Sequence, residues 1–144
     1  MSWSQSNLPV KKEIWKELID CFNAQGYDVF SNVIRLSDDY GVAKSCFLTF
    51  EEAYCLASMS KGIIGLRSGL IETLTTINVP IICFYTDFYE RGALNSIPVD
   101  KVLNSFSLKK LPNVYINNMY EYNLEDYSKE NILSVINGGF GCLK

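Results

Sequence analysis

The stretch GIIGLRSGLIETLTTINVPIICFY, from Gly62 to Tyr85, contains two apolar runs separated by a short segment with helical spacing. Short apolar runs of this kind are typical of strands buried on both faces of a sheet. Pro80 stands between the helical segment, 70–78, and the second run. A strand, a helix and a second strand in this order predict a βαβ unit with a parallel sheet.

The rest of the chain continues this alternation. A helix is expected after Pro9, because apolar residues recur at helical spacing up to a glycine at position 26. Thr49 and Glu52 have the spacing of a capping box, which predicts the start of a second helix, 50–61. Further strands are expected at 27–34 and 113–118, further helices at 99–106 and 126–139, and a loop with one short strand at 35–48.

This order predicts an α/β fold. We expect a three-layer Rossmann-like parallel sheet flanked by helices, in a single domain of residues 1–144 with 137–144 as a loose tail. The pattern begins with a helix, whereas doubly wound folds normally begin with a strand, so the usual first strand is expected to be missing.

Composition narrows the functional classes. The net charge of -3 disfavours a nucleic-acid partner, and the absence of His excludes Ser-His-Asp and Cys-His catalysis within this chain. The five Cys lack the spacing of a zinc site, so we expect small buried hydrophobic side chains in a reducing compartment. No signal peptide is visible and no run reaches the ~20 apolar residues of a membrane span, which predicts a cytoplasmic protein without a transmembrane segment.

The junction after the first apolar run is the candidate site. Ligands of parallel sheets bind beyond the carboxyl ends of strands, where Arg67, Ser68 and Gly69 stand. Amides at the start of the next helix, a hydroxyl and a forked cation suit a diphosphate, and Glu72 one turn later could accept hydrogen bonds from ribose hydroxyls. A local interpretation stays open, in which Ser68 caps the helix, Glu72 favours its positive end and Arg67 forms a surface ion pair.

These residues carry a resemblance. GIIGLRSGLIETL followed by NVPIICFYTD resembles the C-terminal, donor-binding half of GT-B-fold glycosyltransferases and the related nucleotide-sugar 2-epimerases. Those families share a strand, a small Ser-Gly turn, a Glu one helical turn later and a Pro that opens the next strand. The Arg-Ser-Gly form resembles bacterial surface-polysaccharide transferases and fucosyltransferase-like proteins, and the similarity extends over roughly residues 8–90.

The resemblance implies a function for each matched position. Ser68, Gly69 and Leu70 would hold the diphosphate of a nucleotide-sugar donor, Arg67 would offset its charge without a metal, and Glu72 would hold the ribose. Asn32, near the end of an earlier strand, would line the nucleotide pocket. In the family a second Rossmann-like domain binds the acceptor and usually carries the catalytic base, so no catalytic residue is assigned here. The sequence thus leans towards a glycosyltransferase, with neither metal nor cofactor expected.

Two other functions stay open. A non-catalytic nucleotide-binding or regulatory module could cover an open sheet edge by forming a homo-oligomer. A small hydrolase of nucleotides or N-glycosides would place Glu72 at the chemistry.

Other chemistry-bearing residues have simpler explanations. Asp38 and Asp39 are expected in a solvated turn rather than a metal site, and Asp87 at the polar start of a loop rather than on a substrate. Cys83 lies in mid-strand with no cation to activate it, so we expect no nucleophile there. Packing is favoured over stacking on a base for four aromatic residues: Phe84, Tyr85, Phe88 and Tyr89.

Overall fold

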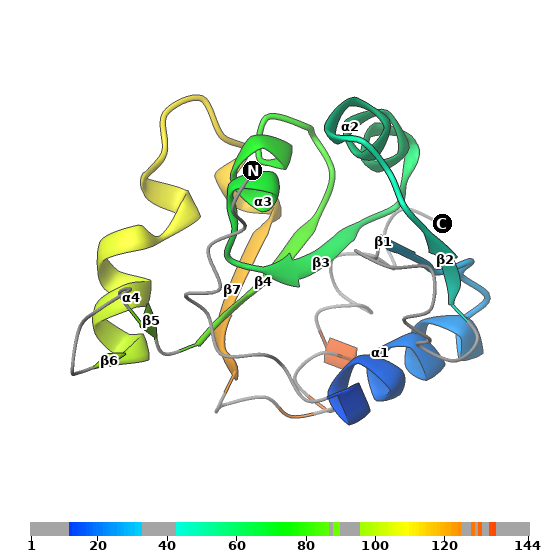
Figure 1. The fold of residues 1–144 in the computed structure, drawn as a ribbon, viewed down its shortest axis with the longest axis horizontal. Helices are drawn as coiled ribbons and strands as arrows, with labels where there is room; N and C mark the ends of the chain where they lie inside the picture. The colour runs from blue at the N-terminus through cyan, green and yellow to red at the C-terminus, as the bar shows by residue number, and fades with distance from the viewer. Residues whose placement is uncertain are drawn as a thin grey trace. The chain divides into compact units, whose positions relative to one another are not determined.

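The computed structural model describes residues 12–32, 43–86, 88–89, 96–124, 128, 130 and 133–134 (Figure 1). Chain contacts divide it into two compact units, the described residues of Val10–Leu56 (the N-terminal unit) and those of Ala57–Lys144 (the C-terminal unit). The expectation of a single domain stays a prediction. Within the described ranges, no helix combines the length and the hydropathy needed to cross a membrane.

The N-terminal unit begins with the expected helix, α1 (Lys12–Ala24), whose apolar face buries Leu18, Ile19 and Phe22. Gly26 ends it with φ +85°, a left-handed conformation that costs glycine little. The amide of Gly26 donates to the carbonyl of Asn23, and the amide of the next residue donates to the carbonyl of Phe22. This pair of hydrogen bonds is a Schellman motif, which satisfies the last carbonyls of α1.

Two short parallel strands follow, β1 (Phe30–Asn32) and β2 (Lys44–Cys46), in a register that pairs Phe30 with Lys44. Helix α2 (Phe50–Met59) then runs from the N-terminal unit into the C-terminal one. Its capping box is confirmed, because Thr49 N donates to Glu52 Oε2 at 2.8 Å and Glu52 N donates to Thr49 Oγ1 at 3.2 Å.

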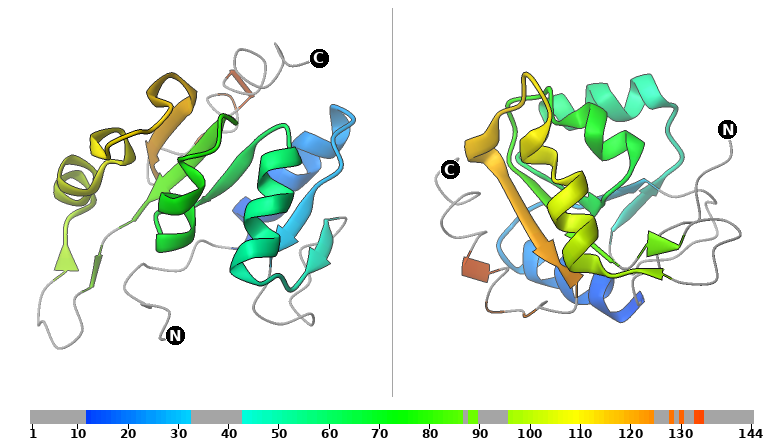
Figure 2. Two further views of the ribbon diagram at one scale, coloured as in Figure 1. Left: turned by 90° about the horizontal axis from the view of Figure 1, so that it is seen from above. Right: turned by 90° about the vertical axis from the view of Figure 1, so that its left-hand side faces the viewer.

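The C-terminal unit contains a parallel three-stranded sheet in the order β3-β4-β7. Strand β3 (Ile63–Leu66) leads through α3 (Gly69–Leu74) to β4 (Ile81–Tyr85), as predicted for a βαβ unit. Strand β7 (Met119–Asn123) lies on the other side of β4, and Figure 2 shows the three strands from two further directions. Helices combined with a parallel sheet confirm the α/β class.

Between β4 and β7 the chain forms a short antiparallel pair, β5 (Phe88–Tyr89) and β6 (Ser96–Ile97). Helix α4 (Val99–Phe106) follows where a helix is expected, and two short 3₁₀ helices, η1 (Leu108–Lys110) and η2 (Ile116–Asn118), lead into β7.

The core of the C-terminal unit is centred on β4, all of whose five residues are buried. Ile71 and Leu74 are the buried residues of α3, and an added Cβ on Gly65 would lie 2.8 Å from Ile71 Cδ1. Glycine in β3 therefore lets α3 pack closely on the strand. Helix α4 buries Val99 and packs against β4 and β7.

Three sequence predictions need correction. The strand expected at 113–118 is wrong, since 116–118 form η2 and the strand is β7, which starts at Met119 where the chain becomes buried again. The helix expected at 70–78 ends at Leu74, because the Thr75 hydroxyl binds the Glu72 carbonyl and competes with continued helix. Cys55 is exposed rather than buried, because α2 turns Ala53 and Ala57 inward.

The short strand expected within 35–48 is confirmed by β2. Several other expectations lie outside the described residues: the Asp38–Asp39 pair, Asp87, most of the helix at 126–139 and the tail at 137–144.

Candidate functional site

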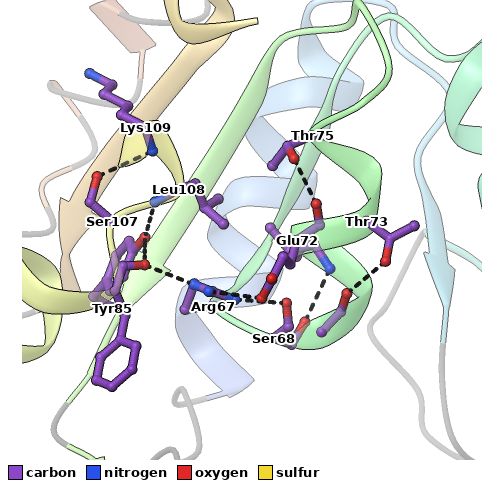
Figure 3. Close-up of polar contacts among 12 residues, drawn as sticks. Arg67, Ser68, Glu72, Thr73, Thr75, Tyr85, Ser107, Leu108 and Lys109 are labelled. Carbon is purple, nitrogen blue, oxygen red and sulfur yellow. Dashed lines mark hydrogen bonds and ion pairs between the residues drawn. The ribbon is translucent and has the colours of Figure 1, made fainter. Parts of the chain in front are cut away.

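The candidate site is the turn that joins β3 to α3, at the carboxyl end of β3 (Figure 3). Arg67 is the first residue after the strand, and its amide donates to the carbonyl of Phe84 at 3.0 Å, which extends the ladder with β4. The parallel ladder thus places Arg67 beyond the carboxyl ends of the strands, which is where α/β proteins bind ligands.

The guanidinium of Arg67 is held on three sides. Nε donates to the carbonyl of Phe106 at 3.0 Å, Nη1 to the carbonyl of Ser68 at 3.1 Å, and Nη2 to Oε2 of Glu72 at 2.9 Å. The Arg67 side chain is only 17% exposed, compared with 46% for Glu72. A largely sheltered cation thus faces a half-exposed carboxylate.

Ser68 is the N-cap of α3, and its Oγ accepts from the amide of Ile71 at 3.3 Å. Its carbonyl accepts from the amide of Glu72 at 2.9 Å, which begins the helix. Ser68 therefore caps α3, as the local interpretation expects, and Arg67 forms an ion pair with Glu72, although the Arg67 side chain is largely sheltered rather than on the surface. The ligand-binding functions predicted for these residues are a separate matter and stay predictions.

Gly69 and Leu70 occupy the first turn of α3, where amides have no intrahelical acceptor because of their position. A Cβ added to Gly69 would meet no atom within 4 Å, in contrast to Gly65. Open space next to Gly69 is consistent with a close approach by a ligand, as the sequence predicts.

Asn32 is the last residue of β1 and belongs to the N-terminal unit. Its Oδ1 accepts from the amide of Leu48 at 3.2 Å, which ties the ends of β1 and β2 together. That Asn32 lines a nucleotide pocket stays a prediction.

A second polar cluster, which the sequence analysis missed, stands next to Arg67. Oε1 of Glu121, from β7, accepts from the Tyr85 hydroxyl at 2.5 Å and from the amide of Leu108 at 2.7 Å. Oε2 of Glu121 accepts from the Ser107 hydroxyl at 2.6 Å. In the sequence, Glu121 is visible only as a carboxylate between two Tyr residues in MYEYN. Its hydrogen-bond partners are 13 to 36 residues away, so no local pattern points to the cluster.

The aromatic residues at the end of β4 are packed rather than available to a base. Phe84 and Tyr85 are fully buried, which confirms packing as their use, whereas the side chains of Phe88 and Tyr89 are outside the described ones. Burial raises the pKa of the Tyr85 hydroxyl, and the neighbouring Cys83 and Glu121 raise it further. Tyr85 therefore acts as a neutral donor.

The thiol of Cys83 is buried in β4, and burial raises its pKa to about 12, with a further contribution from the Glu121 carboxylate. The Arg67 guanidinium lowers this pKa, contrary to the expectation of no cation, but its effect is outweighed. A thiol that keeps its proton is a poor nucleophile, as predicted for Cys83. Among the described residues, no three His, Cys, Asp or Glu side chains gather in a way that could hold a metal ion.

Comparison with known proteins gives no match to a protein-family model, to a curated protein or to a solved structure. The resemblance to GT-B glycosyltransferases therefore depends on the motif around Arg67, Ser68, Gly69 and Glu72.

Proposed function

We propose that this chain is the nucleotide-diphosphate-sugar donor-binding domain of a GT-B-type glycosyltransferase that acts in surface-polysaccharide synthesis. In this proposal strands β3, β4 and β7 belong to a three-layer Rossmann-like sheet. The acceptor and the catalytic base belong to a second Rossmann-like domain, so the chain binds the donor and the partner domain completes the reaction.

One observation carries the proposal: a sheltered guanidinium, a capping Ser and an open Gly stand together at the carboxyl end of a parallel strand. This arrangement supports an anion at the turn, because the forked donors of Arg67 suit two phosphate oxygens. The space beside Gly69 allows the diphosphate to approach the backbone of the first turn of α3.

The ion pair between Arg67 and Glu72 gives the binding step a definite chemistry. A phosphate oxygen would replace Oε2 of Glu72 on Nη2 of Arg67, since both are anionic acceptors of a charged donor. The released carboxylate, 46% exposed, would then accept hydrogen bonds from the ribose hydroxyls. Two residues that neutralise each other would thus separate to hold the two halves of the donor.

The test is a calorimetric titration of the chain with UDP-, GDP- and ADP-sugars. We expect one class of nucleotide to bind without added metal, and Arg67→Ala to weaken it by roughly 10- to 100-fold, as for loss of a charged hydrogen bond. Gly69→Ala should also weaken binding while leaving the fold intact, because the added methyl group enters the space the diphosphate needs.

Lys101→Ala is the matched control, because it removes the same charge from an exposed position on α4. It should leave the dissociation constant unchanged to within about twofold, since an isolated surface charge is screened by salt. Circular dichroism confirms that each variant is folded. If folded wild-type protein gives no heat with any nucleotide sugar, or if Gly69→Ala and Arg67→Ala bind as the wild type does, the proposal is wrong.

A further inference from the structure

The Glu121 carboxylate fixes the chain segment between α4 and η1. The carboxylate accepts a hydrogen bond from the Ser107 hydroxyl and another from the Leu108 amide, and these are the two residues after Phe106. Tyr85, fully buried in β4, donates its hydroxyl hydrogen to Oε1 of the same carboxylate. A carboxylate with three donors, one from β4 and two from the junction of α4 and η1, is a rigid anchor, because each bond restricts the others.

This anchor acts on a carbonyl that contacts the candidate site. Phe106 is the last residue of α4, so its carbonyl has no intrahelical donor by position and lies at the negative end of the helix dipole. It accepts from Nε of Arg67 at 3.0 Å and lies 3.3 Å from the Tyr85 hydroxyl. The last turn of α4 contains no basic residue, and cations from outside the helix reach its carbonyls: Arg67 at Phe106 and Lys110 at Asn104.

We propose that Glu121 is a positioning residue for Arg67. By holding residues 107 and 108, Glu121 sets the place of the Phe106 carbonyl, and that carbonyl fixes Nε of Arg67 so that Nη2 faces the position of the Glu72 carboxylate. The part of this inference that concerns ligand affinity rests on the proposed function, whereas the part that concerns the orientation of Arg67 does not.

The physical reason lies in the flexibility of arginine. An Arg side chain loses rotamer entropy when it is fixed, and each ligand must bear that cost unless the protein has already fixed the side chain. Among the hydrogen bonds of Arg67, Nη1–Ser68 and Nη2–Glu72 stay within the turn and helix α3, whereas Nε–Phe106 reaches 39 residues along the chain. The orientation of the guanidinium thus depends on where α4 ends, and Glu121 determines that place.

The first test measures the Nε–Hε group of Arg67 by nitrogen-15 NMR. The sequence has Arg only at 35, 67 and 91, and the signal lost in Arg67→Lys assigns the resonance. We expect Glu121→Ala to shift this signal and to speed its hydrogen exchange by about 10-fold, the equivalent of one hydrogen bond. Glu121→Gln should largely restore it, since the amide oxygen still accepts from Leu108 N and the Tyr85 hydroxyl.

Two further variants make the result specific. Tyr85→Phe keeps the ring and removes the hydroxyl, so it should shift the same signal in the same direction and serves if Glu121→Ala does not fold. Asn118→Ala is the control, because Asn118 donates to Asn78 and precedes β7 at the opposite end of the sheet. It should leave the Arg67 signal in place even where it lowers stability.

The second test repeats the nucleotide-sugar titration in a double-mutant cycle. Glu121→Ala should weaken binding by about fivefold in the wild type and should have no further effect in Arg67→Ala, since the two changes remove the same interaction. If the wild type binds no nucleotide sugar, the proposed function fails while the NMR signal still decides the positioning. If the Arg67 signal is unchanged in folded Glu121→Ala and Tyr85→Phe, Glu121 does not position Arg67 and the inference is overturned.

Discussion

Gly65 in β3 and Gly69 at the start of α3 should respond in opposite ways to an added methyl group. An added Cβ on Gly65 would lie 2.8 Å from Cδ1 and 3.1 Å from Cγ1 of Ile71, whereas a Cβ on Gly69 would meet no atom within 4 Å. Ile71 is only 5% exposed and is β-branched on a helix, so it has little room to turn away. Gly65→Ala therefore forces α3 away from β3.

The magnitude follows from two opposing terms. Overpacking a core by one methyl group costs about 1–3 kcal/mol, and replacing Gly with Ala returns about 0.4–1 kcal/mol by restricting the unfolded chain. We expect Gly65→Ala to lower the free energy of unfolding by about 1–2 kcal/mol. Gly69→Ala should be neutral to within about 0.5 kcal/mol or slightly stabilising, because it restricts the unfolded chain without overpacking the core.

Urea unfolding followed by circular dichroism measures both variants, with an unchanged m-value as the check that only stability has moved. Ile71→Val sharpens the test, because it removes the Cδ1 atom that an Ala at position 65 would meet. On its own it costs about 0.5–1.5 kcal/mol, but combined with Gly65→Ala the total loss should fall short of additivity by about 1 kcal/mol. Wild-type stability in Gly65→Ala, or strict additivity in the double variant, would refute the close packing of α3 on β3.

Three further predictions concern local features and one buried thiol. Gly26→Ala should lower stability by about 1–2 kcal/mol in urea unfolding, because a side chain at φ +85° is strained, and an unchanged midpoint would contradict the Schellman end of α1. Thr49→Ala should cost about 1 kcal/mol by the same measurement, since Glu52 loses its reciprocal partner; no loss would mean that water replaces the cap. The pKa of Cys83 rises to about 12 on folding, so the folded protein keeps a proton that the unfolded chain releases above about pH 9. Stability should therefore fall as the pH rises from about 9 to 12, and Cys83→Ala should flatten that fall; an identical slope in the variant would show that the thiol does not contribute.

Local features were the ones that the sequence predicted well. The capping box at Thr49 and the glycine end of α1 depend on residues within five positions of each other, so their chemistry is visible in the sequence. The apolar run of β4 was recognisable because a central parallel strand is buried on both faces. Strand β7 was misplaced because MYEYN mixes polar and aromatic residues, and only Met119 of its five residues is buried.

For the candidate site, the sequence by itself determined that a cation, a hydroxyl and a glycine follow a buried strand, and that Ser68 can cap the helix after it. Only the tertiary structure decided what the cation contacts. Arg67 donates to the Phe106 carbonyl 39 residues away, and Glu121 accepts from Tyr85 36 residues away. Both contacts form because a parallel sheet brings distant segments together at the carboxyl ends of its strands. Hydrogen bonds act over about 3 Å of space whatever the separation along the chain, so no local pattern contains them.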